Sequence, residues 1–283
     1  MDAFDTLPDG TPFPFWDDRT AYRQVYHVAQ GHPRAADDNP GTEAAPFASI
    51  GRAAQLLQPG EKVVVHAGVY RECVRPARGG TATDGMIAYE AAPGEPVVVT
   101  GAEAWTPAAR PSAGWAMTPP ANGATVWMAD LPEALFRAYN PFLVRNAYEY
   151  MTHYAQLQDP AWLTRAMMRR GMIFCNGRRL AQVFRARELS GRDGAFWVEE
   201  SGLRVHFRLP GDAAPETPLE VSAREQTFAP SETGLGYIRV SGFTFTHAAG
   251  PLPVPQRGSL STSRGHHWII EDCRVEWANG VGI

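Results

Sequence analysis

Two segments near the end of the chain, residues 237–248 and residues 267–278, carry the same apolar pattern at an offset of 30 positions. Apolar side chains coincide at four aligned pairs, which are Ile238 and Trp268, Val240 and Ile270, Phe243 and Cys273, and Phe245 and Val275. Self-similarity at a period of about 20 to 50 residues is the signature of a repeat architecture. Short strands with inward-facing apolar side chains, each coil lying on the previous one, form a parallel β-helix, and the repeat predicts that fold.

Short β-branched runs earlier in the chain extend this pattern. They are Val25–Val28, Val63–Val65 followed by His66, Ile87–Tyr89 and Val97–Val99. A hairpin joins its strands through about two to five residues, and these gaps are longer, so stacked coils remain an alternative to hairpins. After the first run, Ser49 is placed to cap a helix over 49–58 whose apolar side chains share one stripe. Such a helix would cover the open first coil.

The middle of the chain has a different character. Asn176-Gly177 is a strong hairpin signal, and the runs 196–198 and 203–207 flank a second turn at Ser201-Gly202. A strand is expected at 219–221 and some helix across 155–170. Five tryptophans gather here and favour a sandwich core over a sugar platform: Trp105, Trp115, Trp127, Trp162 and Trp197.

These patterns divide the chain into four predicted parts. An N-terminal arm (1–24) precedes the first coils with their capping helix (25–101). An inserted antiparallel, β-sandwich-like domain (102–229) follows, and further coils (230–283) continue the solenoid. The sequence therefore predicts an all-β protein.

Composition narrows the class of partner and the compartment. A net charge of −4 disfavours nucleic acid and anionic membrane, which both reward a concentrated basic surface. No stretch approaches the ~20 apolar residues that span a bilayer, and no secretory signal opens the chain. Three distant cysteines, Cys73, Cys175 and Cys273, fit reduced thiols better than a disulfide framework. We expect a cytoplasmic protein.

Several polar residues invite a chemical role and favour a structural one. His266-His267 could suggest zinc, but zinc needs three or four ligands and neighbours on a strand point to opposite faces. His247 follows a strand and could reach a groove or cap a turn, and His66 is expected on the outer wall. Asp37 and Asp38 fit a turn better than a cation site. The sequence predicts no metal and no cofactor.

A set of ordered motifs carries a family resemblance. The motifs are Tyr26–Ala29, Val65–Glu72, Asn140–Phe142, Glu232–Gly234 and Trp268–Asp272. In this set the chain resembles glycoside hydrolase family 120, the β-xylosidases, from about residue 24 to its end. The resemblance implies a right-handed parallel β-helix interrupted by a β-sandwich, in a retaining, exo-acting hydrolase that releases xylose from xylo-oligosaccharides. It also implies a homo-oligomer, a tetramer in this family.

The resemblance assigns one residue of this chain to the sugar groove. Tyr150 matches a family tryptophan that lines it, and a tyrosine keeps a stacking face there. The family's Asp nucleophile and Glu acid/base lie on coils beyond the position of Ile283. We therefore expect the natural protein to be longer and these residues alone to be hydrolytically silent.

The spacing of strands gives an independent test for catalytic carboxylates. Retaining glycosidases hold two of them about 5–5.5 Å apart, close to the ~4.8 Å between neighbouring strands. Acids at equivalent positions on adjacent coils would therefore suit retention. In the repeat, Glu271 falls opposite Ser241 and Glu276 opposite Thr246, while the strand next to Glu90 offers valine or histidine, so no such pair is found.

Two other functions remain open from the sequence. Pectate and alginate lyases share the β-helix and usually need bound Ca²⁺, so a polysaccharide lyase is one alternative. A non-catalytic carbohydrate-binding β-helix module is the other, and the missing acids favour it. In each case the expected partner is an oligosaccharide.

Overall fold

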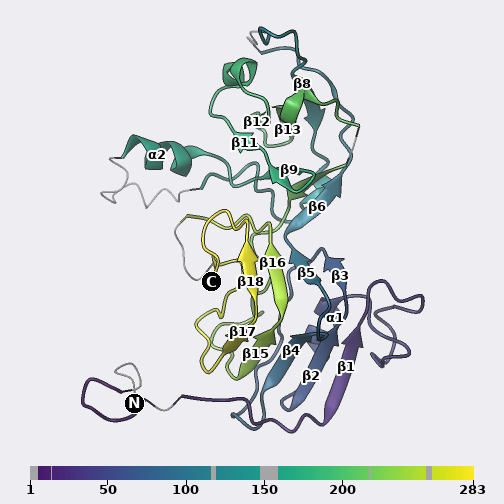
Figure 1. Ribbon diagram of the computed structural model, residues 1–283, viewed down its shortest axis with the longest axis vertical. Coiled ribbons are helices and arrows are strands. Elements are labelled where there is room, and N and C mark those ends of the chain that lie inside the picture. The colour runs from purple at the N-terminus through teal and green to yellow at the C-terminus, as the bar shows by residue number, and fades with distance from the viewer. Residues whose placement is uncertain (1–5, 14, 116–118, 147–158, 217, 253–256) are drawn as a thin grey trace.

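The computed structural model describes residues 6–13, 15–115, 119–146, 159–216, 218–252 and 257–283 (Figure 1). The described chain is mostly β-strand, with two α-helices, α1 (Ile50–Leu56) and α2 (Pro160–Met167), and 3₁₀ turns η1 (Glu133–Leu135), η4 (Ala186–Gly191) and η5 (Pro210–Asp212). None of the described helices has the length and apolar character needed to cross a membrane.

Two sheets contain only parallel strands. The first is ordered β1 (Gln24–Val28), β2 (Glu61–Val65), β4 (Ile87–Ala91), β15 (Ile238–Ser241) and β17 (Ile269–Glu271). The second is ordered β3 (Gly68–Tyr70), β5 (Val97–Thr100), β16 (Phe243–Thr246) and β18 (Arg274–Glu276). Each coil gives one strand to each sheet, because β2, β4, β15 and β17 are each followed in the chain by their counterpart in the second sheet.

The register confirms the 30-residue repeat. Arg239 pairs with Ile269 in the first sheet, and Thr244 pairs with Arg274 in the second, each at an offset of 30 positions (269 − 239 and 274 − 244). The segments read as a repeat are therefore parallel strands lying side by side. Stacked coils, and not hairpins, also account for the earlier short runs.

The bends of the two last coils fall at residues with a left-handed backbone. Positive φ angles recur at the repeat offset: Tyr237 and His267 (54° and 55°), Gly242 and Asp272 (83° and 51°), and His247 and Trp277 (61° and 51°). Most side chains disfavour this region by about 1–2 kcal/mol. The last coil accepts that cost at three residues and the coil before it at two, since Gly242 has no side chain.

The interior of the stack is a single apolar core. Val63, Tyr89 and Val240 are fully buried in one column of the first sheet, and Phe245 is fully buried in the second. The helix α1 adds Ile50, Ala53 and Ala54 to this core from the end of the stack that holds β1 to β3 (Figure 1). As predicted, Ser49 caps this helix, with its Oγ accepting from the backbone N–H of Arg52.

Two further sheets lie between β5 and β15 in sequence. One is ordered β10 (Arg178–Arg179), β9 (Ile173–Cys175), β14 (Leu219–Ser222) and β6 (Ala102–Trp105). The other is ordered β11 (Ala181–Gln182), β12 (Ala195–Val198), β13 (Arg204–Arg208), β8 (Trp127–Asp130) and β7 (Arg110–Pro111). We refer to residues 102–222 as the insert. Its own core includes Phe142, Phe196 and Phe207.

Both predicted hairpins of the insert are confirmed. Asn176 and Gly177 have φ angles of 49° and 72° between antiparallel β9 and β10, as a type I′ turn requires. The strands β12 and β13 form the second hairpin. The expectation of a wholly antiparallel insert is wrong at one point, because β11 pairs in parallel with β12. The 3₁₀ turn η4 carries the chain back, so both strands run in the same direction.

Residues 15–23 lie along the N-terminal ends of the strands in the first sheet. The indole N–H of Trp16 donates to the carbonyl of Trp268 at 3.2 Å, and the backbone N–H of Met86 donates to Thr20 Oγ1 at 2.8 Å. The N-terminal segment is thereby held against three different coils.

Candidate functional site

The ladders of the parallel sheets hold no acids at adjacent positions within the described residues. Ser241 stands between Glu90 on one side and Glu271 on the other, which places the two acids two strand spacings apart, about 9–10 Å. Arg239 donates to both carboxylates. Although burial disfavours its charge, Glu271 and Glu90 raise the pKa of Arg239 above its usual value. This row is an ion-pair network, and the sequence-based search is confirmed.

The candidate histidines have structural partners. His66 lies 3.2 Å from the ring of His27 and 3.1 Å from Glu95 Oε1, which fits its predicted place on the wall. His247 is buried, with Nδ1 3.0 Å from Thr100 Oγ1. Burial lowers the pKa of His247, which favours its neutral form.

His266 and His267 do not lie on opposite faces of a strand, as the sequence had suggested. They lie in the bend before β17, where their Nδ1 atoms approach to 2.9 Å, because the positive φ of His267 turns its ring back. No cluster of three metal-ligating His, Cys, Asp or Glu side chains occurs in the part of the chain that the structure describes. The three cysteines are free thiols. Asp37 accepts the backbone N–H groups of Ala48 and Ser49, the loop-building role expected of it.

A cavity of about 410 Å³ separates the second sheet's edge from the insert, and it holds two carboxylates, Glu72 and Glu225. Burial raises the pKa of Glu72, although the backbone N–H groups of Ile50 and Gly51 donate to its two oxygens and oppose the shift. Glu225 bridges Arg170 and Arg257 at 3.5 and 2.7 Å. All four carboxylate oxygens therefore have a hydrogen-bond or ion-pair partner within the described residues.

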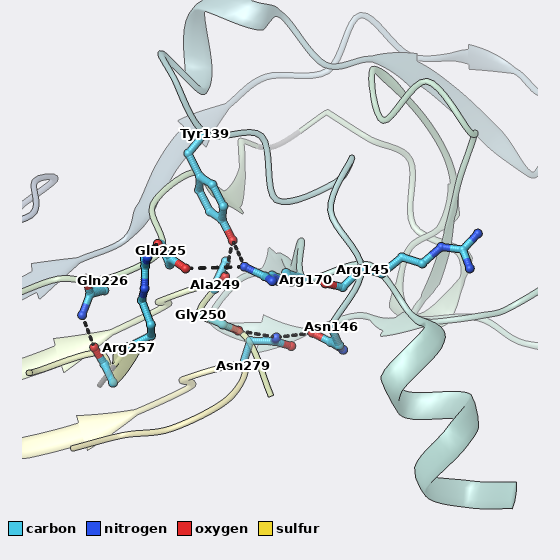
Figure 2. A network of polar contacts seen from close by, with 11 residues as sticks. Tyr139, Arg145, Asn146, Arg170, Glu225, Gln226, Ala249, Gly250, Arg257 and Asn279 are labelled. Atoms are coloured by element: carbon cyan, nitrogen blue, oxygen red, sulfur yellow. Dashed lines mark hydrogen bonds and ion pairs between the residues drawn. The ribbon is translucent and has the colours of Figure 1, made fainter. Parts of the chain in front are cut away.

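A network of buried polar groups fixes the insert to the coils (Figure 2). The guanidinium of Arg170 is 3% exposed, and its Nε donates to the carbonyl of Arg145 at 2.9 Å. Tyr139 Oη donates to the carbonyl of Ala249 at 2.6 Å. We call these contacts, with Glu225 and the asparagine pair described next, the junction network.

The asparagine pair forms the other half of the junction network. Asn279 Nδ2 donates to Asn146 Oδ1 at 2.5 Å and to the carbonyl of Gly250 at 2.8 Å (Figure 2). Asn146 Nδ2 in turn donates to the carbonyl of Arg165 at 2.9 Å. Both asparagines are buried. These hydrogen bonds therefore fix the position of the insert loop at Asn146 relative to the corner of the last coil at Asn279.

Beside the asparagine pair lies a groove, which we call the corner groove. It consists of two adjoining hollows of about 690 and 240 Å³ that share Arg179 and Gln182. The first is completed by the β9–β10 hairpin and Trp277, and the second by the helix α2, Asn146 and Asn279. The insert and the helix α2 thus form one wall, and a coil corner forms the other.

Trp277 offers an aromatic face in the corner groove. Its side chain is 45% exposed, unusual for a tryptophan, and it packs edge-on against Phe174 with ring centroids 5.9 Å apart. Phe174 itself contacts His247, one coil earlier, at 4.0 Å. Trp277 was not among the residues predicted from the sequence to contact a sugar. Its place in the repeat, one coil after His247 at a bend, was the feature that could have indicated it.

Arginines dominate the polar lining of the corner groove. Arg165, Arg169, Arg178 and Arg179 line it, and no carboxylate does in the part of the chain that the structure describes. Loss of solvent contact and the nearby charge of Arg165 lower the pKa of Arg179. Arg169 Nη1 donates to the carbonyl of Leu143. Arg169, Arg178 and Arg179 line this one groove, whereas Arg170 belongs to the junction network.

The remaining predicted aromatics fall into different places. Trp105 is buried in the insert core, in agreement with the prediction, whereas Trp115 is 46% exposed and packs edge-on against Trp197 at 4.8 Å. Tyr150 lies outside the described residues. Asn146, the last described residue before it, lines the corner groove.

The fold of this chain recurs in proteins of known structure. No protein-family model matches the chain, and no curated protein is similar to it in sequence. Similar structures are XylC in complex with xylose, a protein described as a glycoside hydrolase, and a GH136 lacto-N-biosidase from Eubacterium ramulus. Where their descriptions state an activity, these neighbours are glycoside hydrolases.

XylC shares its fold with most of this chain. The TM-score is 0.70 at 25% sequence identity, and the match covers 90% of this chain and 40% of XylC. This chain therefore spans less than half the length of XylC. The glycoside hydrolase (TM-score 0.47, 15% identity, 80% of this chain and 51% of that one) and the lacto-N-biosidase (0.34, 13%, 88% and 30%) are more distant.

Proposed function

We propose that this chain is part of a retaining, exo-acting glycoside hydrolase of the β-xylosidase type, which releases xylose from xylo-oligosaccharides. In this proposal the coils form a right-handed parallel β-helix, and the insert is a β-sandwich-like domain. The observation that carries the proposal is the structural likeness to XylC, whose structure holds xylose. The motifs that resemble glycoside hydrolase family 120 point to the same substrate.

The corner groove is the proposed place for the oligosaccharide. Ligand sites combine apolar or aromatic surface with a few polar groups that fix orientation. Trp277 supplies an exposed ring, and the exposed side chains of Asn176, Arg178 and Arg179 supply polar groups along the same groove. An amide both donates and accepts hydrogen bonds, as the hydroxyl groups of a sugar require.

The catalytic acids are proposed to come from coils that follow Ile283. In the described ladders Glu90 and Glu271 are separated by a full strand and are both bound to Arg239. Acids on directly adjacent strands would lie near the ~5 Å of retaining enzymes. A further coil would extend the wall that already carries Trp277.

The test uses the gene product that includes the continuation of this chain. We expect it to hydrolyse an aryl β-xyloside with retention of configuration, and we expect Trp277→Ala to raise KM at least about tenfold, a loss of roughly 1.4 kcal/mol of binding. Trp115→Ala removes an equally exposed tryptophan outside the groove and is the control. No turnover of the xyloside, or equal effects of the two variants, would contradict the proposal.

A non-catalytic carbohydrate-binding module is the second candidate, because no acid pair occurs in the ladders of the described residues. It predicts that the complete protein binds xylo-oligosaccharides and leaves them intact. Product analysis after long incubation separates the two functions.

A further inference from the structure

The charge of the corner groove differs from that of the chain. The protein carries a net charge of −4, yet among the described residues four arginines and no acid line the groove. Arg165, Arg178 and Arg179 have no ion pair with any described carboxylate. Elsewhere in the insert, Arg204 by contrast pairs with Asp130 at 2.6 Å.

Unpaired guanidinium groups in a groove favour an anionic ligand. A guanidinium presents a planar fork of donors that matches a carboxylate or phosphate with two parallel hydrogen bonds. A groove lined by one sign of charge also concentrates ligands of the opposite sign. The β9–β10 hairpin places Arg178 and Arg179 next to each other on one rim, and α2 places Arg165 on the other side of Arg179.

The rest of the lining shows which anion fits. A bare phosphate would engage the arginines alone and leave the exposed ring of Trp277 unused. The hollow beside Trp277 measures about 690 Å³, within the ~300–1,000 Å³ typical of small-molecule sites. Its size and its mixture of aromatic, amide and guanidinium groups suit a sugar ring that carries a carboxylate.

We propose that the corner groove binds a uronic acid residue, so that the preferred substrate is a xylo-oligosaccharide bearing glucuronic acid and not a neutral one. This inference rests on the proposed function and adds to it the charge of the substrate. The arginines of the β9–β10 hairpin bind the carboxylate, while Trp277 stacks against a sugar ring.

Calorimetric titration of this chain tests the inference with two ligands, xylotriose and the same oligosaccharide carrying one glucuronic acid. We expect the acidic ligand to bind about tenfold more tightly, a difference near 1.4 kcal/mol, and the preference to decline with added salt. The double variant Arg178→Gln/Arg179→Gln should abolish the preference and change binding of neutral xylotriose less than about twofold.

A matched control removes two exposed arginines elsewhere on the insert. Arg187→Gln/Arg192→Gln lowers the net charge equally, on side chains that do not line the groove, and should keep the preference. Thermal unfolding shows that each variant is folded. Equal loss in both double variants would mean long-range charge alone and would overturn the inference.

The remaining outcomes separate this inference from the proposed function. Neutral and acidic ligands binding equally well would refute the uronic acid site and leave the xylosidase proposal standing. Binding of neither ligand would refute the uronic acid site, and the assay on the aryl β-xyloside would then decide the proposed function separately. Inorganic phosphate that displaces the acidic ligand at equal affinity would show an anion site without sugar recognition, and it would also overturn the inference.

Discussion

Tyr89 presents an unsatisfied hydroxyl to the core of the coil stack. Its side chain is fully buried, packs edge-on against Phe228 at 5.1 Å, and has no hydrogen-bond partner for its Oη within the described residues. Burial raises the pKa of this phenol, since no neighbour compensates for the lost water. We expect Tyr89→Phe to stabilise the protein.

The magnitude follows from two opposing terms. Leaving a buried hydroxyl unpaired costs about 1–3 kcal/mol, which the substitution removes. The void left by one oxygen atom, roughly 10–15 Å³, costs about 0.3 kcal/mol at 24 cal/mol per Å³. The free energy of unfolding should therefore rise by about 0.7–2.7 kcal/mol. At roughly 2–4 °C per kcal/mol for a protein of this size, the shift in Tm is readily measured.

The same substitution at a second core tyrosine supplies the control. Tyr70 is 2% exposed, and its Oη donates to the carbonyl of His66 at 2.9 Å and accepts from the N–H of Gln30 at 3.3 Å. Tyr70→Phe should lower the free energy of unfolding by about 1–2 kcal/mol. Urea denaturation followed by circular dichroism measures both variants. A loss of 1 kcal/mol or more in Tyr89→Phe would refute the reasoning and indicate a partner such as an internal water.

Three further predictions concern single sites. Burial raises the pKa of Glu72 above 4.5, so the folded chain holds this proton more tightly than the unfolded chain. The stability of the wild type relative to Glu72→Gln should therefore rise as the pH falls from about 7 toward 4.5, and parallel stability–pH curves would contradict this. A Cβ at Gly280 would lie 2.0 Å from a backbone carbonyl oxygen, so Gly280→Ala should cost about 1–3 kcal/mol of stability. A Cβ at Gly191 would meet no atom within 4 Å, so Gly191→Ala should show no measurable change in thermal unfolding. In a double-mutant cycle, Asn146→Ala and Asn279→Ala should show a coupling of at least about 0.5 kcal/mol, and strict additivity would mean that the pair does not hold the insert.

The coils could be predicted from the sequence where nothing interrupts them. β15 and β17 are offset by 30 positions, and so are β16 and β18, which leaves the period visible. Earlier offsets are irregular: Lys62 pairs with Ala88 after 26 positions (88 − 62), and Ala88 pairs with Arg239 after 151 (239 − 88). Pairing constrains only the strands, so loops of any length leave the fold intact and erase its period.

Short strands and the groove escaped prediction for a common reason. The two-residue strand β11 exists because β12 offers it a partner, and propensity over two residues has little weight against such a context. Likewise Gln182 and Trp277 line one hollow although 95 positions separate them (277 − 182). Their proximity depends on how the junction network seats the insert, and no local pattern in the sequence encodes that contact.

Equivalent corners of successive coils differ in how far their side chains are exposed to solvent. His247 and Trp277 share a positive φ and a place after the strand of the second sheet, so the backbone directs both side chains alike, about 4.8 Å apart along the stack. Phe174 covers the ring of His247 at 4.0 Å and touches Trp277 only by an edge at 5.9 Å. The boundary of the insert therefore decides which corner becomes core and which stays exposed. Strand pairing fixes the position of each corner along the stack, while the residue type at a corner is free to vary. Substrate contacts should therefore be sought at coil corners beside the insert. The flat walls are less suitable, because ion-pair rows such as Glu90–Arg239–Glu271 already satisfy their polar groups.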